Sequence, residues 1–356
     1  MTNIEMGAYI GAAIIVVAIV YNKVQEYKAR KSVARAFSSD HDDVLMRSDE
    51  REPSFDLGGG NGGTGGEGGM VEPIIGGTTL PGTDPSTPAS ELATSLVDPL
   101  IDCLIPLALE AAVRGDKILP ALQSLRHVGN KPVHFIGMHV NGDWEPIMHG
   151  GVYTRLQAGV QMASRTTALN ELEYSELVTR LRALADEIGA EPEIPDMIEV
   201  MGEARTLHRF VSGHDAQLGV NLLSNGAPWS IATLIGALEK QGFDVRPDGR
   251  YIMPDGDGGQ LFTLSTNVTL GADTTSRLTL LLDVPCVAPQ REGFSQMVAC
   301  AKALVGRLDA IIVDDSDQPL MDEALGEINN QVLEFYQEMD AADIPAGSTR
   351  AMRLFS

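Results

Sequence analysis

Three groups of polar side chains in this chain have the residue types that could hold a metal ion or transfer a proton. The first is a set of histidines, His134, His139 and His149. Side chains alternate between the two faces of a strand, and His134 and His139 are five positions apart in a strand-like segment. These two side chains would point to opposite faces, so we expect three separate histidines and no metal site.

Two acidic segments give no better support for chemistry. The segment PDGDGG at 254–259 is similar to the start of a calcium-binding loop, but a strand-like QLF follows where further ligands are required. This pattern predicts a hairpin turn. Asp314, Asp315 and Asp317 could form an acid pair, yet they follow a predicted strand and are of the type that caps turns.

Other signs of catalysis or cofactor binding are missing from the sequence. No glycine-rich phosphate-binding motif precedes a predicted helix, and no nucleophile has a base at a motif spacing. Cys103, Cys286 and Cys300 have no metal-ligand spacing, which favours buried free thiols in a reducing compartment. We therefore predict a protein that is not an enzyme, with no catalytic residue, no metal and no cofactor.

The second half of the chain has the periodicity of strands that alternate with helices. Residues 217–223, 278–285 and 310–315 are typical of strands, and Asp-Gly turns divide residues 243–268 into short strands. Gly242 is suited to end the first helix in a left-handed cap. The apolar faces of three predicted helices are formed by Ile231, Leu234, Ile235 and Leu238, by Phe294, Met297, Val298, Ala301, Leu304 and Leu308, and by Met321, Leu325, Ile328, Val332, Tyr336 and Met339.

The first half repeats this order of elements without repeating the residues. Residues 102–109, 133–140 and 153–162 are typical of strands, with an Asn-Gly turn after the second. Two helices are predicted, one with Leu119, Leu122 and Leu125 on one face and the other with Leu177, Leu181, Leu184 and Ile188. We predict an α+β fold, a mostly antiparallel sheet with helices on one face, in two tandem copies at 96–200 and 213–343.

The amino-terminal segment has a different character. Residues 6–22 carry no charge, and about 25 Å of helix from such a segment is just enough for a bilayer core. Basic residues follow in a juxtamembrane segment at 23–37, which predicts an outside amino terminus and a cytoplasmic body by the positive-inside rule. We expect a single transmembrane helix, with a cleaved signal or a buried helix as the alternatives.

Residues 38–95 are expected to form a disordered linker. The segment is acidic and contains LGGGNGGTGGEGG at 57–69, followed by prolines among Thr, Ser and Gly. Such a composition has too few apolar side chains to offset the entropy of ordering. As a flexible coil it would span roughly 40 Å. The net charge of −23 argues against a nucleic-acid partner, because phosphate binding requires clustered Lys and Arg.

Five segments of the second half form a specific pattern when taken together. They are GVNLL at 219–223, ALEKQGF at 237–243, PDGDGGQLFTLSTNV at 254–268 with Gly271, LTLLLDVP at 278–285, and IIVDDSDQPL at 311–320. With this pattern, residues 213–340 resemble the C-terminal domain of the ZipA family, bacterial membrane tethers that bind the tail of the tubulin-like division protein FtsZ. The order of the expected transmembrane helix, basic juxtamembrane segment and long linker is also similar to that of the family. The linker in the family, however, is usually rich in Pro and Gln.

The resemblance implies a fold and a partner-binding mode. In the family an FtsZ tail, extended and then helical, lies in a shallow apolar groove on the open face of the sheet. Aligning the strands places the partner-binding positions at Leu281, Asn267, Thr269, Asp248, Arg250 and Gln217. Only Leu281 is apolar among them. A one-residue slip would exchange these positions for Tyr251, Ile252, Val268 and Leu280, and a bulge at Gly249 would bring Tyr251 to the open face.

Two functions are carried forward from the sequence. The first is a membrane anchor that binds the FtsZ C-terminal tail and tethers filaments at the inner membrane of the division septum. The second is a membrane-tethered scaffold with the same fold and a partner other than FtsZ, which the polar groove favours. Trp144 and Tyr153 in the first copy are candidate aromatic anchors for a partner docking there, with ordinary sheet residues as the alternative.

Overall fold

The protein was analysed as a computed structural model that describes residues 88–246, 250–268 and 271–356. The chain divides into two units, 1–73 and 74–356, and all described residues lie in the second. The expected transmembrane segment at 6–22, the basic segment at 23–37 and most of the expected linker lie outside the described residues. No helix within the described ranges has the length and apolar character needed to cross a membrane.

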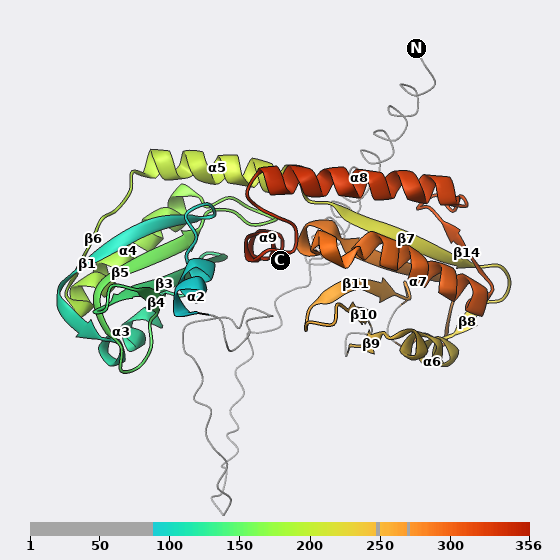
Figure 1. The fold of residues 1–356 in the computed structure, drawn as a ribbon, viewed down its shortest axis with the longest axis horizontal. Helices are drawn as coiled ribbons and strands as arrows, with labels where there is room; N and C mark the ends of the chain where they lie inside the picture. The colour runs from blue at the N-terminus through green and yellow to red at the C-terminus, as the bar shows by residue number, and fades with distance from the viewer. Residues whose placement is uncertain (1–87, 247–249, 269–270) are drawn as a thin grey trace, which may run out of the picture. The chain divides into compact units, whose positions relative to one another are not determined.

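The first of two lobes, which we name the N-terminal lobe, covers residues 89–213 (Figure 1). Its elements are α2 (Ala89–Leu96), β1 (Asp102–Arg114), α3 (Gly115–Leu122), β2 (His127–Val128), β3 (Lys131–His139), β4 (Trp144–Pro146), β5 (Val152–Gln161), α4 (Glu171–Ile188), β6 (Ala190–Pro192) and α5 (Met197–Gly213). The sheet has the order β2-β3-β5-β1-β6, with β4 paired to β3, and its β1, β3 and β5 pairings are antiparallel.

Helix α4 covers one face of this sheet because its apolar stripe meets the alternating apolar residues of the strands. Leu177, Leu181 and Leu184 are buried with Ile105 and Leu156. A capping box formed by an Asn and a Glu begins the helix, and a left-handed glycine ends it. The core of this lobe therefore lies between α4 and one face of the sheet.

The C-terminal lobe covers residues 217–341 and has the elements that its sequence periodicity predicts. They are β7 (Gln217–Ser224), β8 (Trp229–Ser230), α6 (Ile231–Gln241), β9 (Asp244–Val245), β10 (Tyr251–Pro254), β11 (Gln260–Ser265), β12 (Thr274–Thr275), β13 (Arg277–Asp283), η1 (Val284–Cys286), η2 (Pro289–Arg291), α7 (Gly293–Leu308), β14 (Ala310–Val313) and α8 (Asp322–Ala341). The main sheet is antiparallel with the order β14-β7-β13-β11-β10-β9. Helix α7 packs on β14, β7, β13 and β11.

The two sheets share an order of strands. Counting along the chain, β1, β5 and β6 of the first lobe correspond to β7, β13 and β14 of the second, and α4 corresponds to α7. The path β3-β5-β1-β6 then matches β11-β13-β7-β14. The mixed α+β fold with antiparallel sheets is as expected from the sequence, and the shared strand order is the structural basis for considering two copies.

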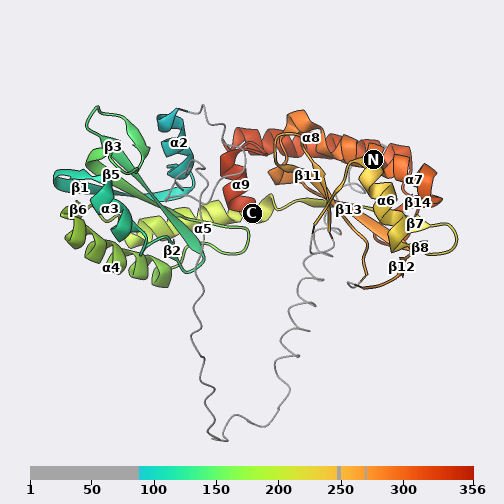
Figure 2. The ribbon, with the colours of Figure 1, turned by 90° about the horizontal axis from the view of Figure 1, so that it is seen from below.

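One expectation about the linker and the helices is wrong. Residues 89–95 belong to the expected disordered segment, but they form α2 (Figure 2). Ala93 of this helix and Val97 just after it are buried against Ile136 on the sheet face opposite α4. The N-terminal lobe therefore has helices on both faces, because a short apolar stripe in the Pro- and Ser-rich segment is sufficient to dock.

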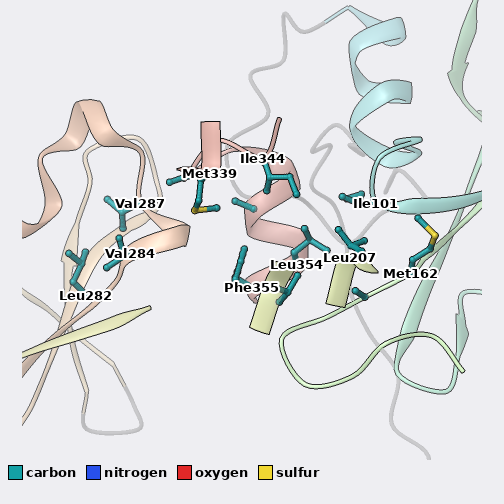
Figure 3. Close-up of a cluster of buried hydrophobic side chains, with 14 of the residues drawn as sticks. Ile101, Met162, Leu207, Leu282, Val284, Val287, Met339, Ile344, Leu354 and Phe355 are labelled. Atoms are coloured by element: carbon teal, nitrogen blue, oxygen red, sulfur yellow. The ribbon is translucent and has the colours of Figure 1, made fainter. Parts of the chain in front are cut away.

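A further helix, α9 (Thr349–Phe355), packs between residues of both lobes. Leu354 and Phe355 are fully buried, and α9 lies against η1. Figure 3 shows the apolar side chains around it, including Ile101 and Leu207 of the N-terminal lobe and Val284 of the C-terminal lobe. Side chains of the two lobes and of α9 therefore belong to one continuous core.

Candidate functional site

The sheet of the C-terminal lobe has one face covered by α7 and one opposite face, which we name the open face. Strand pairing places four residues in a row across it. Leu281 of β13 pairs with Gly219 of β7 on one side and with Thr263 of β11 on the other, and Thr263 pairs with Ile252 of β10. Directly paired residues of antiparallel strands share a face, so this row forms a short apolar strip across four strands.

Solvent exposure confirms the orientation of this strip. Leu281 is 36 % exposed, whereas its neighbours Leu280 and Leu282 are fully buried under α7. Gly219 is exposed, and a Cβ placed on it would have no heavy atom closer than 3.9 Å. The glycine therefore leaves an unfilled space beside the Leu281 side chain.

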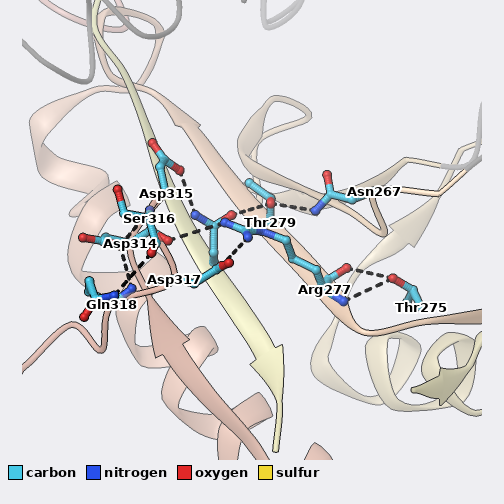
Figure 4. A network of polar contacts seen from close by, with 10 residues as sticks. Asn267, Thr275, Arg277, Thr279, Asp314, Asp315, Ser316, Asp317 and Gln318 are labelled. Carbon is cyan, nitrogen blue, oxygen red and sulfur yellow. Dashed lines mark hydrogen bonds and ion pairs between the residues drawn. The ribbon is translucent and has the colours of Figure 1, made fainter. Parts of the chain in front are cut away.

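A hydrogen-bonded network borders the strip on the same face (Figure 4). Thr279 Oγ1 donates to Asn221 Oδ1 at 2.6 Å, and Asn221 Nδ2 donates to Asp315 Oδ1 at 2.9 Å. Asn267 Nδ2 donates to Thr279 Oγ1 at 2.8 Å. Asn221 is only 2 % exposed, so its amide is held in one orientation by partners on both sides.

The loop after β14 supplies the acidic side of this network. Asp314 Oδ1 accepts hydrogen bonds from the backbone N–H groups of Ser316 and Gln318, each at 2.8 Å. Arg277 Nη1 is 2.5 Å from Asp317 Oδ1. Asp314 therefore caps the turn, as the sequence predicted, whereas Asp315 and Asp317 contact side chains of the sheet.

The partner-binding positions taken from the resemblance are distributed unevenly. Leu281 is on the open face, and so is Gln217, because it pairs with Asp283 two positions along both strands. Asn267 joins the same face through Thr279, and Arg250 is exposed just before β10. Asp248 and Thr269 lie outside the described residues.

Tyr251 does not reach the open face. It pairs with Leu264, which is fully buried under α7, and Tyr251 itself is 4 % exposed. Gly249, where a bulge was considered, lies outside the described residues, but Tyr251 belongs to the core and Ile252 takes the open-face position. Leu280 is fully buried, so the one-residue slip that would place it on the open face does not occur in β13.

Of the two candidate anchors in the N-terminal lobe, Tyr153 is buried and Trp144 is partly buried. Tyr153 has no exposed surface, and its hydroxyl accepts a hydrogen bond from Met148 N and donates to Glu145 Oε1. Trp144 packs against the small cluster under α2. These aromatic residues are therefore structural parts of the lobe.

The residues considered for chemistry are equally structural. His149 Nδ1 lies 3.0 Å from Asp116, whereas burial lowers the pKa of His134 to about 4. In the turn at 254–259, Asp255 Oδ1 accepts the N–H groups of Asp257 and Gly259. Among the described residues no group of three His, Cys, Asp or Glu side chains could hold a metal ion.

The geometry therefore defines a class of domain, a mixed α+β module with one sheet face covered by helices and the other available to a partner. Residues 217–331 match the family model of the ZipA C-terminal FtsZ-binding domain. The resemblance noted in the sequence is confirmed over these residues, and the C-terminal lobe is a ZipA-like domain. The matched family is one of binding domains of the cell-division machinery.

The strand alignment made from the sequence did not identify four residues that the structure places on or beside the open-face strip. They are Gly219, Asn221, Thr263 and Thr279. The alternation of β7 and β13 was a usable signal, because every second residue from Gln217 and from Leu281 must share their face. The hydrogen bonds to Asp315 gave no such signal, because that residue comes from a loop far along the chain.

Proposed function

We propose that this protein anchors FtsZ filaments to the inner membrane at the division septum, and that its open face binds the FtsZ C-terminal tail. The observation that carries the proposal is the uncovered row of Gly219, Leu281, Thr263 and Ile252 within the matched region. A flexible tail loses entropy on docking, and an exposed apolar strip with fixed polar borders is a surface that can compensate for this loss.

The strip is smaller than an extensive apolar groove. Leu281 and Ile252 are its only large apolar side chains, and the Asn221–Thr279 network occupies the adjacent positions. We infer a modest affinity for a single tail. A filament presents many tails to many membrane-bound copies, and effective concentration then makes the assembly tight. The expected transmembrane helix and linker at the amino terminus would provide this arrangement.

The N-terminal lobe forms part of the same proposal as a divergent copy of the ZipA-like domain. The order of its strands corresponds to that of the C-terminal lobe. The alternative function, a membrane-tethered scaffold that binds a different partner, is favoured by one observation, the polar network beside the strip. Such a partner would have to offer hydrogen-bonding groups to Asn267 and Thr279.

A binding titration tests the proposal. The protein would be titrated into a fluorescent peptide of the host FtsZ tail, with anisotropy as the readout. Leu281→Asp and Gly219→Leu should each weaken binding at least tenfold, because one places a charge in the strip and the other fills the space beside it. Leu333→Asp is the matched control, since Leu333 is a 49 % exposed leucine on α8, away from the open face.

Each outcome of this titration has a definite meaning. Binding that both strip variants weaken and the control leaves unchanged would support the FtsZ role and its site. Binding that neither strip variant weakens would reject the open face as the site. No binding of the wild-type protein at high micromolar concentration would reject FtsZ as the partner and favour the scaffold.

A further inference from the structure

The N-terminal lobe carries a helix on the sheet face that is open in the C-terminal lobe. Ala93 of helix α2 and Val97, the extended residue that follows the helix, are 1 % and 4 % exposed and pack against Ile136 of β3. Leu96, Leu104 and Trp144 are partly buried around them. This small cluster is separate from the main hydrophobic core, which lies on the other side of the sheet.

A glycine of the sheet creates the space for this helix. A Cβ placed on Gly159 of β5 would lie 2.8 Å from Cγ1 and 3.2 Å from Cγ2 of Val97. Real Cβ atoms are not found at the shorter of these distances, so Val97 occupies space that only a glycine leaves. Gly159 pairs directly with Leu104 of β1.

The same pair of residue types stands at the corresponding place in the C-terminal lobe. Leu104 is the third residue of β1, and Gly159 is the third residue from the end of β5. Gly219 is the third residue of β7, and Leu281 is the third from the end of β13. The glycine and the leucine have exchanged strands, but each lobe presents one Gly–Leu pair at this position of its sheet.

We propose that this face of the N-terminal lobe is a binding site for a short amphipathic helix, and that α2 occupies it as a displaceable ligand from the same chain. The ligands it fits present a small residue on the helix and an aliphatic residue in the extended chain just after the helix, as Ala93 and Val97 do. An eight-residue helix is not stable alone in water, so α2 forms only while it is docked. Folding on docking is the behaviour of a peptide ligand.

Two arginines of α9 form hydrogen bonds with residues at the carboxyl-terminal end of α2. Arg353 Nη1 donates to the carbonyl oxygen of Leu96 at 3.3 Å, and Arg350 Nε donates to Asp98 Oδ2 at 2.6 Å. The other end begins after Pro88 and has no side-chain cap. Release of α2 therefore starts at its amino-terminal end, where the chain leads toward the expected linker, and exposes Trp144.

The test uses the full-length chain with a labelled peptide of residues 87–100 as the probe. Val97→Asp in the chain should vacate the face, because a carboxylate cannot remain in the apolar cluster. We expect this variant to bind the wild-type peptide at least tenfold more tightly than the wild-type chain does, with a change in Trp144 fluorescence. Adding Gly159→Leu to the variant should abolish peptide binding, whereas adding Gly219→Leu should leave it unchanged.

Three results would overturn the proposal. The first is a folded Val97→Asp variant, verified by circular dichroism, that binds no peptide. The second is peptide binding that Gly159→Leu does not weaken. The third is a loss of cooperative unfolding in both Val97→Asp and the milder Val97→Ala, because α2 would then be a fixed part of the lobe and not a ligand.

Discussion

Arg353 and Asp102 form a paired contact between the last described helix and the first strand of the N-terminal lobe. Arg353 Nη2 donates to Asp102 Oδ1 at 2.6 Å, and Arg353 Nη1 donates to Asp102 Oδ2 at 2.9 Å. Their side chains are 6 % and 0 % exposed. Asp283, at the corresponding sheet corner of the C-terminal lobe, is also paired with an arginine, since Nη2 of Arg165 from the N-terminal lobe donates to both of its carboxylate oxygens, at 2.8 and 2.9 Å.

Removing Arg353 should destabilise the protein strongly. In Arg353→Ala the Asp102 carboxylate stays buried without its counter-ion, which costs about 3–5 kcal/mol. Arg114→Ala is the matched control, because the Arg114–Asp116 pair is exposed and contributes little to stability. Free energies of unfolding from urea titrations at pH 7 would show the difference, and equal losses in the two variants would contradict the prediction.

The decrease in the free energy of unfolding caused by Arg353→Ala should also depend on pH. Burial raises the pKa of Asp102, and Arg353 opposes that rise. Without the arginine, the carboxyl group binds a proton more readily and becomes neutral as the pH falls. The gap in unfolding free energy between wild type and variant should therefore be largest at neutral pH and shrink on acidification. A difference in unfolding free energy that increases from pH 7 to pH 5 would contradict the prediction.

His134 should make the wild-type protein less stable in acid. Burial, followed by the positive charges of Arg353 and His127, lowers the pKa of His134 to about 4, below the ordinary value of 6.5. The unfolded chain thus binds a proton that the folded chain does not, and stability is lost as the pH falls from 6.5 toward 4. The loss between pH 7 and pH 5 should be about 1–2 kcal/mol. His134→Gln should remove this part of the slope in parallel urea titrations.

The three cysteines should be unreactive in the folded protein. Burial raises the pKa of Cys103 and of Cys286 to about 12, and that of Cys300 to about 11. The thiolate is the reacting form, so little of it exists at pH 8. A thiol reagent should label three groups only after urea unfolding. Rapid labelling of any one of them in the native protein would identify an exposed, activated thiol and contradict the prediction.

Asn221 should contribute to stability through its two side-chain hydrogen bonds. In Asn221→Ala the hydroxyl of Thr279 and the carboxylate of Asp315 lose their partner, at a cost of about 1–3 kcal/mol. Asn225→Ala is a suitable control, because the Asn225–Asp309 hydrogen bond is exposed. Urea unfolding of both variants measures the difference. The open face keeps Leu281 in Asn221→Ala, so FtsZ-tail binding reports separately on the network.

Local patterns in the sequence were sufficient for much of the C-terminal lobe. Alignment with the family pattern placed Leu281 on the open face, and the side-chain period of two in a strand then places Leu280 in the core. The bulge considered at Gly249 put Tyr251 on the same face, whereas Tyr251 lies in the core. A turn of unknown length shifts the register, and one residue of shift exchanges the two faces.

Other parts of the structure depend on partners that are distant in sequence. Helix α2 has one well-buried side chain, Ala93, in a segment whose composition favours disorder, and Val97 just after the helix occupies space that Gly159 leaves. Arg353 and Asp102 are 251 residues apart, and no local pattern joins them. Contacts of this kind are determined by how the whole chain packs, so periodicity alone does not reveal them.

The contact between Arg353 and Asp102 also sets an order of events during protein synthesis. Strand β1 leaves the ribosome early, and the other strands of its lobe follow within about a hundred residues. The arginine that neutralises its buried aspartate is translated only after the entire C-terminal lobe. At about 5–20 residues per second, the nascent N-terminal lobe spends on the order of 10–40 seconds with that charge uncompensated. During this interval the lobe is less stable than it is in the finished protein.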